Sequence, residues 1–315
     1  SIDVVINIVL TEGSDKNHYQ TALNSVECYA ALHGYQLRIE FDSKFKECSR
    51  HRDKFFRRHC HTHFLMQREL PENAIVLFID ADVGVVNPNK LIEEFLEPDF
   101  DIYLYNRFYN WEFAAQYLIK NNERGRKWIK RWADMEFTLP DSVHGTDNGA
   151  LHILMMHYLA PDSTNSRLGR MCKTIWEHSR DAWDLFGTQA CTRVVIGERN
   201  EFHDHHVKIF AKGAGWARDA WLLKSHWSDE DFMLHSIKDE RLRAEDVLEE
   251  SHGHNLVKTT DRLGYPLSFP VIERLNISHC ATGEVRWTMD RRLRISNTLR
   301  AREFGRLTTL KLKEQ

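Results

Sequence analysis

The run from Ala74 to Pro88 constrains the fold of this chain more than any other segment. Residues 75–79 are apolar without alternation and rich in β-branched and aromatic types, as expected of a strand that is covered on both faces. Such a strand belongs in the middle of a parallel sheet. Because ligands of open α/β sheets bind beyond the carboxyl ends of strands, Asp80 and Asp82 follow this strand where a functional site is expected.

The spacing of Asp80 and Asp82 predicts a metal site. Residues two apart in an extended segment point to the same side, so their carboxylates can converge on one cation. The two charges repel each other unless a cation or a proton intervenes, and carboxylate oxygens suit Mn²⁺ or Mg²⁺. The alternative is a capped turn, in which Asp82 and Asn87 accept hydrogen bonds from local backbone amides.

Composition indicates a globular α/β protein and gives no electrostatic argument for nucleic acid or membrane binding. The chain has 315 residues, a net charge of −3 and 42% hydrophobic residues. This length allows one large domain with an appendage or two smaller ones. Without about 18 consecutive apolar residues, we expect no signal peptide, no membrane span and no membrane contact by the chain as given. We also expect no nucleic-acid partner.

The cysteines and one sequon leave the compartment open. Six cysteines occur without C-x-x-C spacing, which argues against a zinc ribbon and permits disulfides without showing them. The sequence Asn276-Ile277-Ser278 is an N-glycosylation sequon, which matters only in the secretory pathway.

The order of predicted elements favours a doubly wound nucleotide-binding half. Apolar runs and helical periodicity alternate in βαβαβ order through the first third of the chain. We expect strands at 4–10, 36–41, 75–79 and 101–105. We expect helices at 19–33 and 52–70, a short one after Pro88, and apolar helical stripes at 128–135 and 150–158. Residues 162–170 read as polar connections, and residues 286–313 as a basic helical segment.

Four blocks resemble glycosyltransferases of the GT-A type, specifically a nematode-expanded domain of unknown function related to yeast α-galactosyl- and mannosyltransferases and plant xyloglucan xylosyltransferases. The blocks lie at 57–60, at 77–88, at 106–119 with 144–150, and at 213–238. The resemblance implies a catalytic domain over 1–245, with a nucleotide-sugar half at about 1–110 and an acceptor half at about 111–245. Residues 246–315 would form a C-terminal extension.

The resemblance implies that Asp80 and Asp82 hold Mn²⁺, or Mg²⁺, against the diphosphate of a UDP- or GDP-sugar. His235 matches the histidine that completes the metal shell in the relatives, and His226 ranks second. Lys238 matches the lysine that meets the phosphate. An exposed histidine after an acidic turn is the alternative for His235.

Further donor contacts are expected on the basic helix and after the strand at 101–105. Arg57 and Arg58 would meet the donor phosphates, and Arg107 is assigned to donor binding with them. Two exposed arginines on a solvated helix face are the alternative.

The catalytic and acceptor assignments fall in the third block. Asp147 and Asn148 occupy the place where the relatives set polar side chains beneath the donor sugar, although G-T-D-N-G can also be a turn with a helix N-cap. Trp111 and Glu112 would line an acceptor groove, because an aromatic face packs on sugar C–H surfaces while a carboxylate binds hydroxyls. A buried tryptophan beside a capped glutamate is the alternative.

These observations predict a metal-dependent, retaining glycosyltransferase that moves a sugar to a glycan or glycoprotein acceptor. The alternatives are a non-enzymatic carbohydrate-binding protein, another sugar-nucleotide enzyme such as a nucleotidyltransferase, and a metal-dependent phosphatase or nuclease. The relatives imply the Golgi lumen, as the soluble part of an anchored protein, with a cytoplasmic location as the other option. The donor sugar, the acceptor and the linkage are not encoded in these motifs.

Overall fold

The computed structural model describes residues 2–108, 111–142, 146–242, 260, 266 and 268–314. The chain divides into two compact units that interleave along the sequence. Unit 1 comprises Ser1–Gly13, Arg38–Ile79 and Leu96–Gly215, and unit 2 comprises Ser14–Leu37, Asp80–Phe95 and Trp216–Gln315. These units do not follow the expected divisions at residues 110 and 245, so the assignment of donor and acceptor halves stays a prediction.

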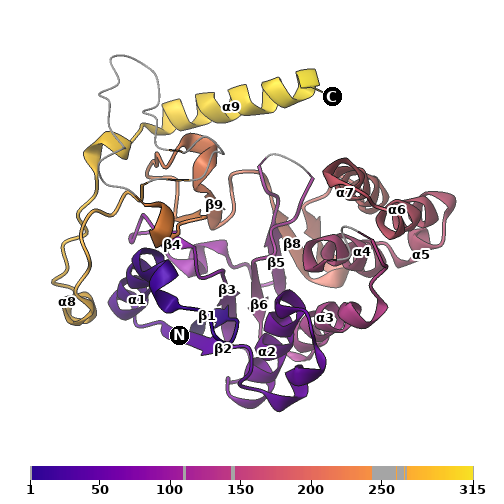
Figure 1. The fold of residues 1–315 in the computed structure, drawn as a ribbon, viewed down its shortest axis with the longest axis horizontal. Coiled ribbons are helices and arrows are strands. Elements are labelled where there is room, and N and C mark those ends of the chain that lie inside the picture. The colour runs from indigo at the N-terminus through magenta and orange to yellow at the C-terminus, as the bar shows by residue number, and fades with distance from the viewer. Residues whose placement is uncertain are drawn as a thin grey trace. The chain divides into compact units, whose positions relative to one another are not determined.

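Unit 1 is built on a seven-stranded sheet with the order β2-β1-β3-β6-β5-β8-β7 (Figure 1). Its strands are β1 (Val4–Leu10), β2 (Gln36–Phe41), β3 (Ile75–Phe78), β5 (Ile102–Tyr105), β6 (Tyr117–Lys120), β7 (Glu201–Phe202) and β8 (Val207–Phe210). β3 pairs in parallel with β1 and antiparallel with β6, and β5 pairs antiparallel with β6 and in parallel with β8. β1, β3, β5 and β8 therefore run in one direction.

The predicted α/β class with a mostly parallel central sheet flanked by helices is confirmed. All four residues of β3 are buried, as its apolar sequence indicated. The expectation of an all-parallel neighbourhood for β3 was wrong on one side, because β6 inserts antiparallel between β3 and β5. An antiparallel strand buried on both faces carries the same unbroken apolar sequence, so composition alone does not reveal its direction.

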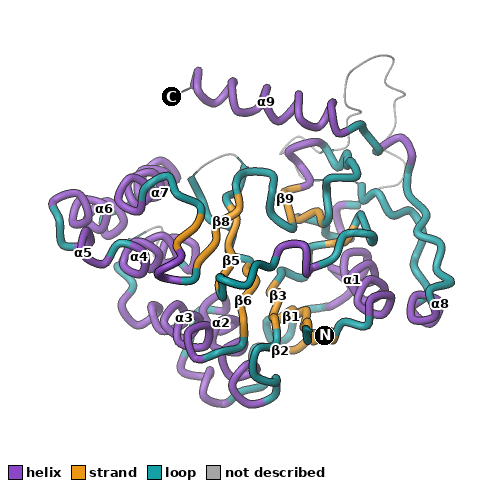
Figure 2. The backbone as a smooth tube through the Cα atoms, turned by 180° about the vertical axis from the view of Figure 1, so that it is seen from behind, coloured by secondary structure: helices purple, strands orange, loops and turns teal. Residues whose placement is uncertain are grey.

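The helices of unit 1 cover this sheet. They are α2 (Lys54–Arg68), α3 (Glu123–Asp134), α4 (Asp147–Leu159), α5 (Pro161–Thr164), α6 (Arg167–Glu177) and α7 (Ala182–Ile196), with 3₁₀ turns at Lys46–Arg50, Met135–Thr138 and His203–His205. Figures 1 and 2 show α4 to α7 gathered near β8. The expected polar connection at 162–170 was wrong, because α5 and the start of α6 occupy it. α6 buries only Gly169, Cys172 and Trp176, so its apolar stripe is short.

The described residues of unit 2 form a small sheet of order β4-β10-β9 and three α-helices. Its strands are β4 (Gly84–Val85), β9 (Ala217–Asp219) and β10 (Met233–His235), and its helices are α1 (Gln20–His33), α8 (Ile277–Thr282) and α9 (Asn297–Glu314). Turns of 3₁₀ helix lie at Lys16–Tyr19, Ile92–Phe95, Ala220–Leu223, Asp239–Arg241 and Arg291–Leu293. The short helix expected after Pro88 is one of these turns, and the basic helix expected from residue 286 begins at Asn297.

The C-terminal segment packs into unit 2, although we expected an extension there. Arg300 of α9 donates from Nε to Asp231 at 2.9 Å, and Arg218 of β9 donates from Nε to the same carboxylate at 2.7 Å. Asp231 is buried, and the two arginines together lower its pKa against the opposing effect of burial. A buried carboxylate shared by two arginines ties α9 to β9.

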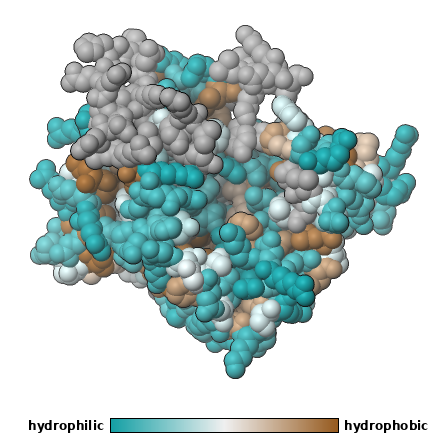
Figure 3. All heavy atoms as spheres, viewed as in Figure 1, coloured by the Kyte–Doolittle hydropathy of each residue, from teal (hydrophilic) through white to brown (hydrophobic). Residues whose placement is uncertain are grey.

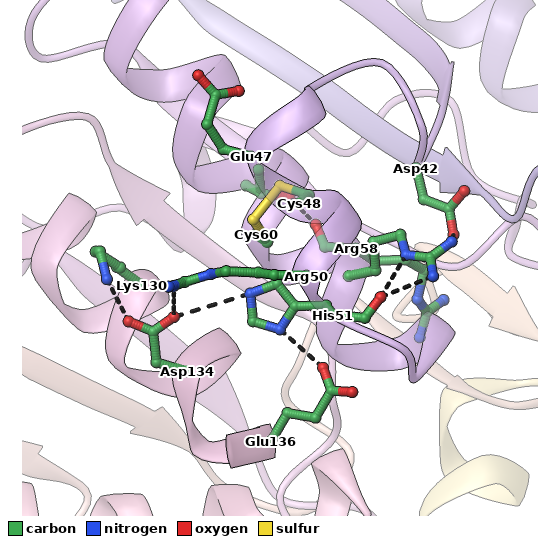
Figure 4. The surroundings of a disulfide bond; sticks show 12 residues. Asp42, Glu47, Cys48, Arg50, His51, Arg58, Cys60, Lys130, Asp134 and Glu136 are labelled. Carbon is green, nitrogen blue, oxygen red and sulfur yellow. Dashed lines mark hydrogen bonds and ion pairs between the residues drawn. A yellow bond between two sulfur atoms is a disulfide. The ribbon is translucent and has the colours of Figure 1, made fainter.

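Three disulfides pair all six cysteines. Cys28–Cys280 joins α1 to α8 in unit 2, while Cys48–Cys60 and Cys172–Cys191 lie in unit 1. Figure 4 shows Cys48–Cys60 beside an ion-pair cluster in which His51 bonds Glu136 at 2.8 Å. The sequence left this pairing open.

The coloured part of the face drawn in Figure 3 is mostly hydrophilic, with small hydrophobic patches. Among the described helices, none combines the length and the apolar character needed to cross a membrane.

Candidate metal centre and associated residues

Asp80, Asp82 and His235 come together in unit 2. One ligand atom from each lies within 4.8 Å of the other two, and all three side chains are partly accessible. Two local features place them: the β4–β10 pairing sets Leu234 opposite Gly84, and Ile237 N donates to Asp82 O at 2.9 Å. These two contacts fix the segment that contains Asp82 and Gly84 to the end of β10, where His235 lies.

The imidazole of His235 is oriented by a third carboxylate, Asp219 on β9. His235 and Asp219 are direct partners in the parallel β9–β10 register, and His235 Nδ1 lies 2.8 Å from Asp219 Oδ1. This contact turns Nε2 toward Asp82 Oδ1 at 3.3 Å and Asp80 Oδ2 at 3.8 Å. A ligating histidine whose second nitrogen bonds a carboxylate is the usual arrangement in metal sites.

The electrostatics of the cluster favour a cation. Burial alone would lower the pKa of His235, but Asp82 and Asp219 outweigh it and raise the pKa well above its usual value. Burial would raise the pKa of Asp82, but His235 and then Lys238 hold it below the usual range. In the absence of metal the imidazolium proton therefore balances the carboxylates, and a divalent ion can replace that proton.

Two carboxylates and one imidazole are a donor set that fits Mn²⁺, and Mg²⁺ through the oxygens. Lys238 lies at the edge of the cluster, with Nζ 4.0 Å from Asp82 Oδ2. The side chains of Asp80 and His235 are 25% and 22% exposed, so further ligands can reach the site from solvent. Whether these residues bind a metal stays a prediction.

His226, the second-ranked histidine, is buried elsewhere in unit 2. Its Nδ1 lies 2.9 Å from Leu223 O and 3.0 Å from Lys224 O, and burial lowers its pKa. Among the described residues, the candidate metal cluster includes His235 and not His226.

Asp147 and Asn148 begin α4 in unit 1. The Asp147 carboxylate is buried and lies 3.5 Å from His59 Nε2, while its backbone O accepts a hydrogen bond from Trp132 Nε1 at 3.0 Å. His59 stacks on Trp132 with ring centroids 3.8 Å apart. Asn148 Oδ1 is buried and has no hydrogen-bond partner among the residues that the structure describes. Asp147 is the first helical residue, with Thr146 at the N-cap, so the turn-and-cap interpretation holds for the backbone.

The arginines assigned to the donor phosphates have protein contacts in unit 1. Arg57 donates from Nε and Nη2 to His51 O at 2.9 and 2.7 Å and lies 3.6 Å from Asp42. Arg58 lies over the rings of Phe55 and Phe78. The alternative of a solvated face does not describe them, and their role in donor binding stays a prediction.

Arg107, assigned to the donor, and Glu112, assigned to the acceptor, pair with each other. Arg107 Nη1 lies 3.2 Å from Glu112 Oε2, and Arg107 N donates to Glu112 O at 2.8 Å. Trp111 between them is 43% exposed, so the buried-tryptophan alternative was wrong. Tyr109, Asn110, His144 and Gly145 of the same block lie outside the described residues.

The candidate residues thus form two sets. Asp80, Asp82, His235, Lys238 and the second-ranked His226 belong to unit 2, and the other predicted residues belong to unit 1. Sequence reasoning missed Asp219, although it lies in the fourth block of the resemblance. A usable signal was available, because Asp219 ends a short strand whose neighbour ends at His235.

The comparisons bear on family and fold. No curated protein matches the chain. Among solved structures, it is similar to a glycosyltransferase involved in glycosylation of the major capsid of PBCV-1, at 12% identity and TM-score 0.38 over 74% of this chain and 93% of that one. It is also similar to the glycosyltransferase GlyE of Streptococcus pneumoniae TIGR4, at 16% identity and TM-score 0.33 over 49% of this chain and 43% of that one.

A family model described as a protein of unknown function, DUF273, matches residues 26–249, which include the candidate metal cluster and every other predicted site residue. The chain belongs to the DUF273 family.

Proposed function

We propose that this chain is a metal-dependent glycosyltransferase that moves a sugar from a UDP- or GDP-sugar to a glycan or glycoprotein acceptor with retention of configuration. The observation that carries the proposal is the cluster of Asp80, Asp82 and His235, with His235 held by Asp219 at 2.8 Å. Asp80 and Asp82 follow β3 directly in the sequence, and ligands of α/β sheets bind beyond the carboxyl ends of strands.

Asp80, Asp82 and the Nε2 atom of His235 would hold the ion. Bound Mn²⁺ would supply Lewis-acid stabilisation to the nucleoside diphosphate as it departs. Lys238 would add a positive charge next to that leaving group, and Asp219 would keep Nδ1 of His235 protonated and Nε2 free to coordinate.

Asp147 and Asn148 would stabilise the positive charge that develops at the anomeric carbon. Same-face attack by the acceptor hydroxyl would retain the configuration, and a covalent route through Asp147 is the other retaining scheme. The buried contact between Asp147 and His59 supports a carboxylate that is held in one orientation.

Three disulfides support a location in an oxidising compartment such as the Golgi lumen. The exposed sequon residue Asn276 is consistent with this proposal. Its side chain caps α8 by accepting from Ser278 N at 3.1 Å.

The test is nucleoside diphosphate release from a panel of UDP- and GDP-sugars with and without Mn²⁺. We expect release that requires Mn²⁺ and is lost in Asp82→Ala. The matched pair His235→Ala and His226→Ala separates the two histidines, because only the first should weaken Mn²⁺ binding. Release that continues in EDTA or in Asp82→Ala would refute the metal-dependent mechanism, and acceptor binding without any release would favour a carbohydrate-binding protein.

A further inference from the structure

Unit 2 has a small cavity whose lining is basic and aromatic. Its volume is about 240 Å³, and the described residues that line it include no carboxylate. Three arginines and two tryptophans make up most of the wall: Arg286, Arg291, Arg294, Trp227 and Trp287. All of the lining residues except Trp227 lie beyond residue 249, where the match to the family model ends.

The wall of this cavity is held by backbone hydrogen bonds. Asp290 N donates to Pro270 O at 2.7 Å, and Trp227 N donates to Leu293 O at 2.9 Å. The second bond sets Arg294 beside Trp227, with its guanidinium 5.7 Å from a ring centroid of the indole. Trp227 and Leu293 also belong to the hydrophobic cluster of unit 2. The cavity is therefore bounded by packed structure, which positions its charged side chains.

The three guanidiniums of the cavity are not equally neutralised. Arg294 Nη2 lies 2.8 Å from Asp229 Oδ2. Arg286 and Arg291 are exposed, and neither has an ion-pair partner among the residues that the structure describes. Glu273, which is not part of the lining, accepts from a threonine hydroxyl of the wall at 3.4 Å. The cavity thus presents two uncompensated positive charges that a ligand can reach from solvent.

The tryptophans give the cavity an apolar surface. The Nε1 atoms of Trp227 and Trp287 are both buried, and Nε1 is the one polar atom of an indole. Any part of these rings that reaches the cavity is therefore carbon. Such a surface packs against C–H bonds, while the guanidiniums bind an anionic group. The volume is below the roughly 300–1,000 Å³ of pockets for drug-sized ligands, so the ligand is expected to be small.

We propose that this cavity binds a sugar phosphate, with Arg286 and Arg291 contacting the phosphate monoester and the sugar ring packing on the tryptophans. A guanidinium presents paired donors to phosphate oxygens. A phosphate monoester carries a charge of about −1.5 to −2 at pH 7, which matches two uncompensated arginines. A carboxylate or a sulfate ester carries a single charge and balances only one of them. This inference goes beyond the proposed function and does not depend on it.

The experiment measures binding of glucose 6-phosphate by calorimetry in EDTA and without a nucleotide sugar. EDTA prevents the phosphate from binding through a metal ion at the candidate metal cluster. Three comparators are used: glucose lacks the anion, glucose 6-sulfate carries one charge, and inorganic phosphate lacks the sugar ring. We expect glucose 6-phosphate to bind at least about tenfold more tightly than each comparator, and its affinity to decrease as salt is raised.

Substitutions at exposed positions test the assignment of residues. Arg286→Gln and Arg291→Gln should each weaken glucose 6-phosphate binding about tenfold, and the double variant should abolish it. Arg274→Gln is the matched control, because Arg274 is an exposed arginine of unit 2 that does not line the cavity. It should bind like the wild type. Since all three side chains are exposed, the thermal unfolding midpoint should stay unchanged, which verifies the fold.

Three results would overturn the proposal. They are an affinity for any comparator equal to that for glucose 6-phosphate, wild-type affinity in the double variant, and a loss in Arg274→Gln as large as in Arg291→Gln. The assay contains neither metal nor donor, so its result is independent of the proposed function. Sugar phosphate binding without nucleoside diphosphate release would contradict the proposed function and leave this site standing, and release without sugar phosphate binding would do the reverse.

Discussion

Asp219 acts on the candidate metal cluster through His235, so its removal should weaken Mn²⁺ binding without removing a ligand. Its Oδ1 atom accepts from His235 Nδ1 at 2.8 Å and leaves Nε2 facing Asp82. Loss of such an orienting carboxylate typically costs about 10- to 100-fold in metal affinity. For Asp219→Ala this corresponds to about 1.4 to 2.8 kcal/mol. Asp219→Asn keeps an acceptor and should lose less.

The same substitution also changes proton competition, with the opposite sign. Asp219 is one of the groups that raise the pKa of His235, so metal must displace a tightly held proton in the wild type. Below that pKa, each unit of falling pH reduces apparent affinity about tenfold. Asp219→Ala lowers the His235 pKa and relieves part of this competition. The affinity ratio of wild type to variant should therefore be smallest at low pH and should increase as pH rises.

Titration with Mn²⁺, followed by calorimetry or by electron paramagnetic resonance, measures this ratio from about pH 6 to about pH 8, a range that begins near the usual histidine pKa and extends above it. Asp290→Asn is a matched control in unit 2, since Asp290 pairs with Arg292 at 2.9 Å and lies outside the cluster. Thermal unfolding of each variant verifies the fold. Equal affinity of wild type and Asp219→Ala at every pH, or a ratio that falls as pH rises, would refute the orienting role.

Three further outcomes are expected. Mn²⁺ at a hundred times its dissociation constant should stabilise unit 2 by about 2.7 kcal/mol in thermal unfolding, and Asp82→Ala should abolish the shift. Removing Cys28–Cys280 by the double serine variant should cost roughly 5 kcal/mol of unfolding free energy, because the crosslink spans 252 residues. Burial first and Arg193 second lower the pKa of His152 to about 3. The unfolded state therefore binds a proton that the folded state excludes as the pH is lowered from about 6.5 to about 3. Over this range the free energy of unfolding should decrease by up to about 1.4 kcal/mol per pH unit, and His152→Gln should flatten that slope in denaturant titrations.

Most of unit 1 could be predicted because its elements carry strong local signals. The apolar run of β3 and the caps of α2 and α3 are readable from neighbouring residues, as when Asp53 accepts from Phe55 N at 2.7 Å. The helices α6 and α7 were harder to predict, since α6 shows only three buried residues. Their N-caps, Ser166 and Asp181, were nevertheless present as signals. The direction of β6 depends on pairings with strands distant in sequence, which no local pattern specifies.

The candidate site residues also divide into those that a local sequence pattern predicts and those that depend on tertiary structure. Asp80 and Asp82 lie two residues apart and follow a strand, so their convergence is a local property that the spacing already implies. The assignment of His235 to the metal site came from the resemblance to a family. Asp219 was predicted neither from the spacing nor from the resemblance, because the β9–β10 register that pairs these two residues is a tertiary feature. Arg193 is the extreme case. An arginine in a helix is normally solvated, and its significance emerges only when a structure shows that it is buried and that no carboxylate in the described chain pairs with it. A missing partner cannot be seen in a linear pattern, so only the structure distinguishes this buried arginine from a solvated one.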